Sequence, residues 1–226
     1  MTSLRFFASL LLAVGAAHVG MTQGTPIRGL YGELKGSHYV APENRYRIAV
    51  PVLPELGGHI FDTENVVTFS DDVSIYISIA CFPLDMTTRW ERDTRGIKEF
   101  LSYFFGQHVM PNFVQRFPGA TNELSLFTPD IRDGALLVFT LLPGGSSFAA
   151  QGNVLDLPSA APIVAKRGNL LFVQNDHIFI LSTELAERVT QRSVFHKTPE
   201  EENEMLRTRL VELANRLHLP APKPKI

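Results

Sequence analysis

The sequence is poor in cysteine and in net charge. Cys81 is the only cysteine among 226 residues, which excludes an intrachain disulfide framework and a cysteine-based zinc site, because each needs several sulfurs. Lysine and arginine number 21 against 23 aspartate and glutamate residues, a formal net charge of -2. This balance supplies no basic surface of the kind that nucleic-acid binding requires. We therefore expect no nucleic-acid partner.

Local signatures of the common catalytic classes are also missing. The chain contains no P-loop, no G-x-G-x-x-G, no G-x-S-x-G and no H-E-x-x-H, the patterns that mark phosphate, dinucleotide, hydrolase and zinc-protease sites. Its seven histidines are scattered singly rather than at ligand spacing,. We predict that the protein is not an enzyme, with no catalytic residue, no cofactor and no metal site.

The N-terminus has the pattern of an export signal. Arg5 is followed by an apolar run over residues 6–17, which is shorter than the roughly 20 residues that a membrane-spanning helix needs. Small residues suited to cleavage end this run: Gly15, Ala16 and Ala17. We predict a signal peptide over residues 1–17, an exported protein that is periplasmic or secreted, and no stable membrane span after cleavage. A retained, buried or anchoring helix is the alternative.

Alternating, β-rich or continuous apolar runs predict several strands in the mature chain. The predicted strands are 45–50, 66–69, 74–81, 123–127, 135–142, 163–165, 170–173 and 178–181. Turn residues at 167–169 and 175–176 predict two tight hairpins near the end of this series,.

Two segments instead have helical periodicity. Apolar residues recur every three or four positions over 97–109, with Asp93 or Thr94 as the expected cap and Pro111 expected to end or kink the helix near Met110,. A second helix is expected to start at Thr198 and Pro199 and to bury four leucines: Leu206, Leu210, Leu213 and Leu217. The prediction is an α+β fold, in which an antiparallel sheet of about six to eight strands is covered by two main helices.

The expected organisation has one folded domain and flexible ends. Residues 18–36 form a flexible lead-in, residues 37–218 a single domain, and residues 219–226 an extended tail,. Residues 143–162, rich in Gly, Ser, Ala and Pro, form a long loop that is either functional or mobile,.

A possible binding surface is indicated by the lone tryptophan and by the start of this loop. Trp90 either covers an edge of the core or lines a groove. The glycines let backbone approach a ligand, and the serines offer hydroxyls, although a flexible loop explains the same composition. The residues concerned are Trp90, Gly144, Gly145, Ser146 and Ser147.

One stretch and the order of elements carry a resemblance to a known family. The stretch is Tyr46, Arg47, Ile48, Ala49, Val50 and Pro51, and the end of the chain follows with the 170–181 hairpin and the 198–217 helix. Over about residues 37–218 the chain resembles PsbP-like domains. The resemblance implies an antiparallel sheet covered by helices, in an exported noncatalytic domain that binds a partner.

Three functions remain open from the sequence. The first is an exported noncatalytic domain that serves the cell envelope as a protein-interaction or accessory module, its partner being another envelope protein. The second is a carrier that binds a small apolar ligand between the Phe-rich helix and the sheet. The third is an unrecognised hydrolase, in which the fold brings Ser146 or Ser147 to a histidine.

Overall fold

The computed structural model describes residues 29–148, 163–191 and 194–221. The predicted signal peptide, residues 149–162 of the long loop and the last five residues of the tail lie outside these ranges. The strands are β1 (Glu33–Lys35), β2 (His38–Val40), β3 (Arg47–Ala49), β4 (His59–Asp62), β5 (Val66–Ser70), β6 (Tyr76–Pro83), β7 (Thr121–Thr128), β8 (Ala135–Pro143), β9 (Val164–Gln174) and β10 (His177–Glu184). The helices are η3 (Pro42–Asn44), η4 (Pro54–Leu56), α1 (Met86–Arg95), α2 (Ile97–Phe104), the π-helix η5 (Phe105–Val109), α3 (Met110–Arg116), α4 (Glu187–Thr190) and α5 (Pro199–Arg216).

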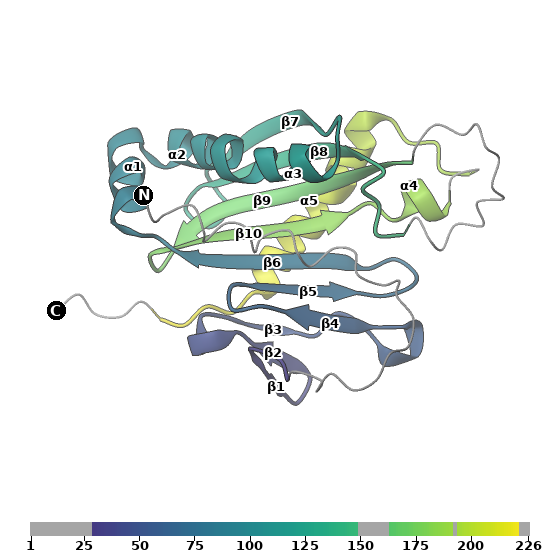
Figure 1. The fold of residues 1–226 in the computed structure, drawn as a ribbon, viewed down its shortest axis with the longest axis horizontal. Helices are drawn as coiled ribbons and strands as arrows, with labels where there is room; N and C mark the ends of the chain where they lie inside the picture. The colour runs from purple at the N-terminus through teal and green to yellow at the C-terminus, as the bar shows by residue number, and fades with distance from the viewer. Residues whose placement is uncertain (1–28, 149–162, 192–193, 222–226) are drawn as a thin grey trace.

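The main sheet has seven antiparallel strands in the order β4-β5-β6-β10-β9-β8-β7, and β1, β2 and β3 form a separate small sheet. Figure 1 shows the run of α2, η5 and α3 in front of the upper strands and α5 behind the sheet. This confirms the predicted α+β fold and its antiparallel sheet. Within the described residues, no helix combines the length and the apolar character needed to cross a membrane.

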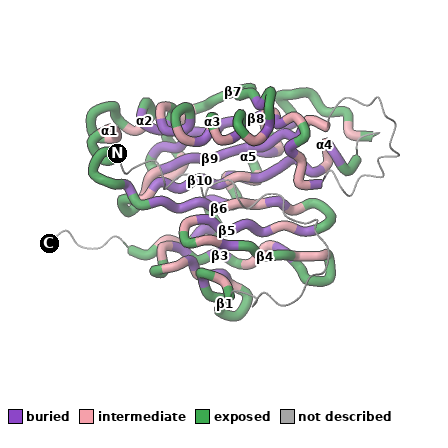
Figure 2. The backbone as a smooth tube through the Cα atoms, viewed as in Figure 1, coloured by how far each residue is buried: buried purple, intermediate pink, exposed green. Residues whose placement is uncertain are grey.

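The sheet separates two hydrophobic cores, because successive side chains of a strand point to opposite faces. On β9, Leu170 and Phe172 belong to the core under α5 and the small sheet, whereas Leu171 belongs to the core under α2 and α3. The central strands are accordingly buried along most of their length (Figure 2). The two predicted helices therefore cover opposite faces of one sheet.

The helical boundaries in the middle of the chain differ from the prediction. Neither Asp93 nor Thr94 caps the helix over 97–109, because both lie inside α1, which ends at Arg95 and is followed by Gly96 with φ of 79°. Pro111 does not end the helical run, which continues through the π-helix to Arg116. Pro111 lies in the first turn of α3, where its missing N–H group costs little,.

A larger error concerns residues 163–173. The predicted turn at 167–169 is wrong, since β9 runs without a break from Val164 to Gln174. Gly168 fits within this strand because α5 packs closely there: a Cβ atom at Gly168 would lie 2.8 Å from Leu210 Cδ1 and 3.1 Å from Leu206 Cβ. Polar residues that indicated a turn are instead the buried polar residues of a strand.

Other local predictions are confirmed. Asn175 and Asp176 form the β9–β10 turn, with φ of 51° and 57°, as a two-residue hairpin loop of this handedness requires. Thr198 and Glu201 form a capping box at the start of α5,. By contrast, the end of the predicted flexible lead-in contains a strand, since the three exposed residues of β1 pair with β2.

Candidate functional site

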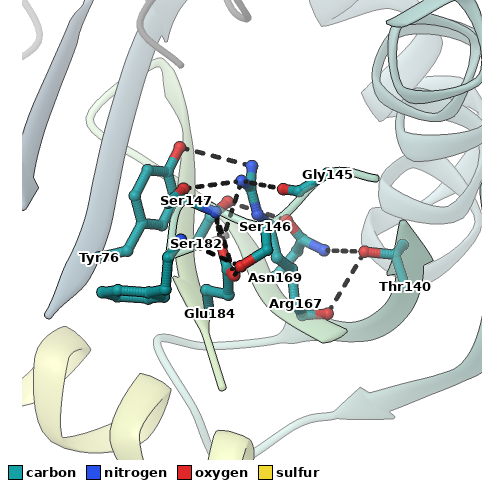
Figure 3. Close-up of polar contacts among 10 residues, drawn as sticks. Tyr76, Thr140, Gly145, Ser146, Ser147, Arg167, Asn169, Ser182 and Glu184 are labelled. Carbon is teal, nitrogen blue, oxygen red and sulfur yellow. Dashed lines mark hydrogen bonds and ion pairs between the residues drawn. The ribbon is translucent and has the colours of Figure 1, made fainter. Parts of the chain in front are cut away.

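The predicted Gly-Ser segment packs against a buried ion pair, which we call the Arg167–Glu184 centre. Register places Thr140, Arg167 and Glu184 side by side on β8, β9 and β10. The strands thus present three polar side chains in one row across the sheet, on the face that α2 covers. The centre consists of Tyr76, Ser146, Ser147, Arg167 and Glu184 (Figure 3).

Arg167 contacts several partners from this buried position. Its Nη2 donates to Gly145 O at 3.0 Å, to Ser147 Oγ at 3.1 Å and to Glu184 Oε2 at 3.3 Å. Its guanidinium lies over the ring of Tyr76, 4.4 Å from the centroid, in a cation–π arrangement. The charge is therefore compensated by a carboxylate, two oxygen acceptors and an aromatic face.

Glu184 fixes the start of the loop. Its Oε1 accepts a hydrogen bond from Ser146 Oγ at 2.6 Å, and its two oxygens lie 3.2 and 3.0 Å from the backbone N of Ser147. Ser146 Oγ in turn accepts from Phe148 N at 3.0 Å, and Phe148 is buried. Gly144 takes φ of 67°, a conformation that glycine adopts without steric cost. The glycines and serines of residues 144–148 therefore belong to a turn that these hydrogen bonds fix in place.

The serines are occupied by these contacts. Ser146 both donates to Glu184 and accepts from Phe148, while Ser147 accepts from Arg167. In the described ranges, no histidine forms a hydrogen bond with either hydroxyl. A serine nucleophile needs a base that is free to take its proton and donors that await an oxyanion. Here the polar groups hold the chain in place.

Sequence reasoning missed Arg167 and Glu184. It placed Arg167 in a turn, although Arg167 and Asn169 are two residues apart between the apolar runs 163–165 and 170–173, a spacing that puts both side chains on one face of a strand. Asn169 lies directly opposite Val138 and Ser182 and accepts from Ser182 Oγ at 2.8 Å. A second polar row therefore follows the first.

The space beneath the middle helix is filled. Phe100, Leu101 and Phe104 are almost fully buried there, in one cluster with residues of β8, β9 and β10. The structure thus places packed aromatic side chains where the carrier hypothesis expected a ligand. Elsewhere, no group of three or more His, Cys, Asp or Glu side chains suited to a metal ion occurs among the residues described.

Trp90 lies on α1, far from the Gly-Ser turn in the chain, and is 62% exposed. Met86, one turn earlier on the same side of the helix, is 87% exposed. The structure does not bring Trp90 together with residues 144–147. Of the two roles expected for Trp90, covering an edge of the core does not agree with this exposure.

An ordinary surface helix packs its apolar side against the protein, whereas α1 packs polar residues against it. Its partly buried residues are polar, namely Thr88, Glu91 and Arg92, and it buries no residue completely. Arg92 Nη1 lies 3.3 Å from Asp176 Oδ1 on the β9–β10 turn, and Arg95 stacks on Tyr103 of α2 at 4.1 Å.

The start of α1 is well defined. The side chain of Asp85 accepts from Thr88 N at 2.7 Å and from the Thr88 hydroxyl at 2.5 Å. These hydrogen bonds lower the pKa of Asp85. Polar contacts therefore attach α1 to the body of the protein, and its apolar side chains face solvent.

Comparison with known proteins gives a likeness of fold. No protein-family profile matches the chain, and no curated protein matches it. A crystal structure from Bacteroides thetaiotaomicron shares 10% identity over 83% of this chain, with a TM-score of 0.39, and the chain spans about half (49%) of that protein.

Two further solved structures are similar along nearly their whole length. The Ran-binding protein Mog1p of Saccharomyces cerevisiae shares 11% identity, with 83% of this chain and 96% of that one covered and a TM-score of 0.47. Cyanobacterial PsbP of Synechocystis shares 11% identity, with 87% and 100% covered and a TM-score of 0.43. The predicted resemblance to PsbP-like domains is therefore found at the level of architecture.

Proposed function

We propose that the protein is an exported, noncatalytic accessory module of the cell envelope that binds another envelope protein through α1. The observation that carries the proposal is the exposure of Trp90 and Met86 on a helix whose partly buried residues are all polar. The predicted export signal over residues 1–17 supports a location outside the cytoplasm.

Tryptophan and methionine are enriched at protein interfaces, and tryptophan among the residues that dominate their binding energy. Arg89, the residue before Trp90, is exposed, and its side chain forms no hydrogen bond or ion pair with any described residue. An apolar centre with a cation at its rim fits a partner that offers an apolar pocket with an acidic edge. Because this patch is small, we expect a weak or transient complex.

The experiment compares two exposed apolar residues on different elements. Trp90→Ala and Leu53→Ala each remove a large side chain, of which 62% and 58% are exposed, so neither variant should change the free energy of unfolding by more than about 0.5 kcal/mol. The native size of the protein is then measured in extracts of the cells that make it. We expect the wild type and Leu53→Ala to migrate in a larger complex and Trp90→Ala to migrate as the free chain. Co-migration of all three, or a wild type found only as the free chain, would overturn the proposal.

A further inference from the structure

A groove of about 380 Å³ lies between β3 and α5, on the face of the main sheet opposite to α2. Its volume is in the range of small-ligand sites, which are mostly apolar with a few polar groups. The apolar side chains that line it come from three elements, β3, β6 and α5, and the segments that adjoin them: Ile48, Val50, Ile75, Ile77 and Leu213. This groove is separate from the Arg167–Glu184 centre, which lies on the other face.

The groove contains a hydroxyl group without a partner. Thr183 lines it and is only 6% exposed. Its side chain forms no hydrogen bond with any of the residues described, and its oxygen is not among the fully buried unpartnered atoms, so the hydroxyl is open to the groove. A ligand that covers this hydroxyl must therefore replace water as its hydrogen-bond partner.

The backbone of β3 also faces the groove. Val50 N donates to Ser37 O on the β2 side, whereas Arg47 exchanges two hydrogen bonds with His218 on the opposite side. Hydrogen-bonding direction alternates along an antiparallel strand, so the N–H and C=O groups of Ala49 point to the side of Arg47, toward α5. Arg216, the last residue of α5, also lines the groove.

The charges around the groove are balanced. Arg209 binds Glu187 through two nitrogens, at 2.5 and 3.2 Å. Burial raises the pKa of Glu187, but the hydrogen bonds from Arg209 and from the backbone outweigh this effect and hold that pKa below its usual value. Arg216 and Glu212 lie 3.6 Å apart and are both well exposed. Two cations and two anions therefore line the groove, and no excess of either sign selects an ion.

We propose that this groove binds an extended, apolar peptide segment of a partner protein, which adds to the free edge of β3 at Ala49. A peptide carries a donor and an acceptor at each residue and so satisfies both Ala49 and Thr183. A fatty acid would instead leave the Thr183 hydroxyl against methylene groups. The α5 wall from Arg209 to Arg216 is about 10.5 Å long, which corresponds to about three residues of a strand.

The test uses the capped tetrapeptide Ac-Val-Thr-Val-Thr-NH2 and the methyl resonances of the full chain. We expect saturable shifts at Ile48, Ile75 and Ile77 and none at Ile180, which lies in the other core. Thr183→Val should weaken binding about threefold to tenfold, whereas Thr208→Val, on the exposed side of α5, should leave it unchanged. Shifts at Ile180, or no saturable shift at any groove methyl, would overturn the proposal.

Two further variants isolate the strand-edge contact. Ala49→Pro removes the N–H group that faces the groove and keeps the β2 ladder, so peptide binding should fall at least tenfold. If this variant does not fold, a peptide N-methylated at its first threonine or second valine tests the same pairing from the ligand side. Equal binding by these forms, or shifts with decanoate but not with the peptide, would contradict strand addition. Trp90→Ala should bind the peptide normally, which separates this site from α1.

Discussion

Glu184 and Arg167 form a salt bridge of 3.3 Å between paired positions of β10 and β9, with 0% and 2% of their side chains exposed. A buried pair of this kind holds structure in place, because loss of either partner leaves an unpaired charge away from water. The Gly-Ser turn, Tyr76 and two central strands meet at this pair.

Removal of the carboxylate should be strongly destabilising. Glu184→Ala leaves Arg167 unpaired and releases Ser146 and Ser147, so we expect a loss of about 3–5 kcal/mol in the free energy of unfolding measured in urea. The control is Glu204→Ala, whose partner Arg207 is likewise well exposed, with a loss below about 1 kcal/mol.

A double variant keeps this prediction testable if Glu184→Ala fails to fold. Glu184→Leu combined with Arg167→Met replaces the buried pair by apolar groups, which is often neutral. It should recover most of the stability. Equal losses for Glu184→Ala and Glu204→Ala would show that the pair is not a structural centre.

The structure shows which features of this centre the sequence could predict. The pairing partners of β9 were partly predictable, since the Asn175–Asp176 turn fixes the register of β9 with β10. The continuity of β9 was not, because arginine, glycine and asparagine are typical turn residues, and only contacts distant in sequence explain them. Gly168 meets α5 and Arg167 meets Glu184, and neither contact is encoded locally.

A methyl group added at Gly168 should lower the stability of the folded protein. Gly168→Ala places a Cβ atom 2.8 Å from Leu210 Cδ1, and such overpacking costs about 1–3 kcal/mol. Gly106→Ala is the control, since its Cβ atom would meet nothing within 4 Å and alanine is the better helix former by about 0.5–1 kcal/mol. Thermal unfolding of both variants should give opposite signs. A Gly168→Ala variant as stable as the wild type would show that α5 packs less closely than described.

Cys81 should contribute to a loss of stability in alkali. Burial raises the pKa of its thiol to about 12, above the value of about 8.5 for an exposed thiol. The folded state thus keeps the proton that the unfolded state loses, and this contribution to stability is full below about pH 8.5 and lost progressively as the pH rises toward 12. Between pH 8 and pH 10 the wild type should lose about 1–2 kcal/mol more than Cys81→Val. Parallel pH profiles for the two proteins would contradict a buried neutral thiol.

The export signal predicts a definite mature protein. If residues 1–17 are removed, the exported chain begins at His18, and the intact mass of the protein recovered outside the cytoplasm should equal that of residues 18–226. Substitution of Ala17 by a large residue such as tryptophan should block this cleavage. Recovery of the full-length mass from the cytoplasm alone would reject both the signal peptide and the envelope location.

The sequence indicated Trp90 as a candidate but could not give its exposure. A lone tryptophan before a helix is as compatible with the edge of a core as with a free surface. The exposure of Trp90 depends on the orientation of α1. Gly96 separates α1 from α2, and polar contacts of Arg92 and Arg95 attach α1 to the rest of the protein. A break at a glycine with φ of 79° turns the helix so that its apolar side faces outward.

The most direct test of partner binding through α1 is site-specific photo-cross-linking in intact cells. A photoreactive phenylalanine analogue replaces Trp90 in one strain and Leu53 in another, and cross-linked species are detected by mass after irradiation. The account predicts a discrete adduct with one envelope protein from position 90 and none from position 53. No adduct from position 90, or the same adduct from both positions, would contradict it.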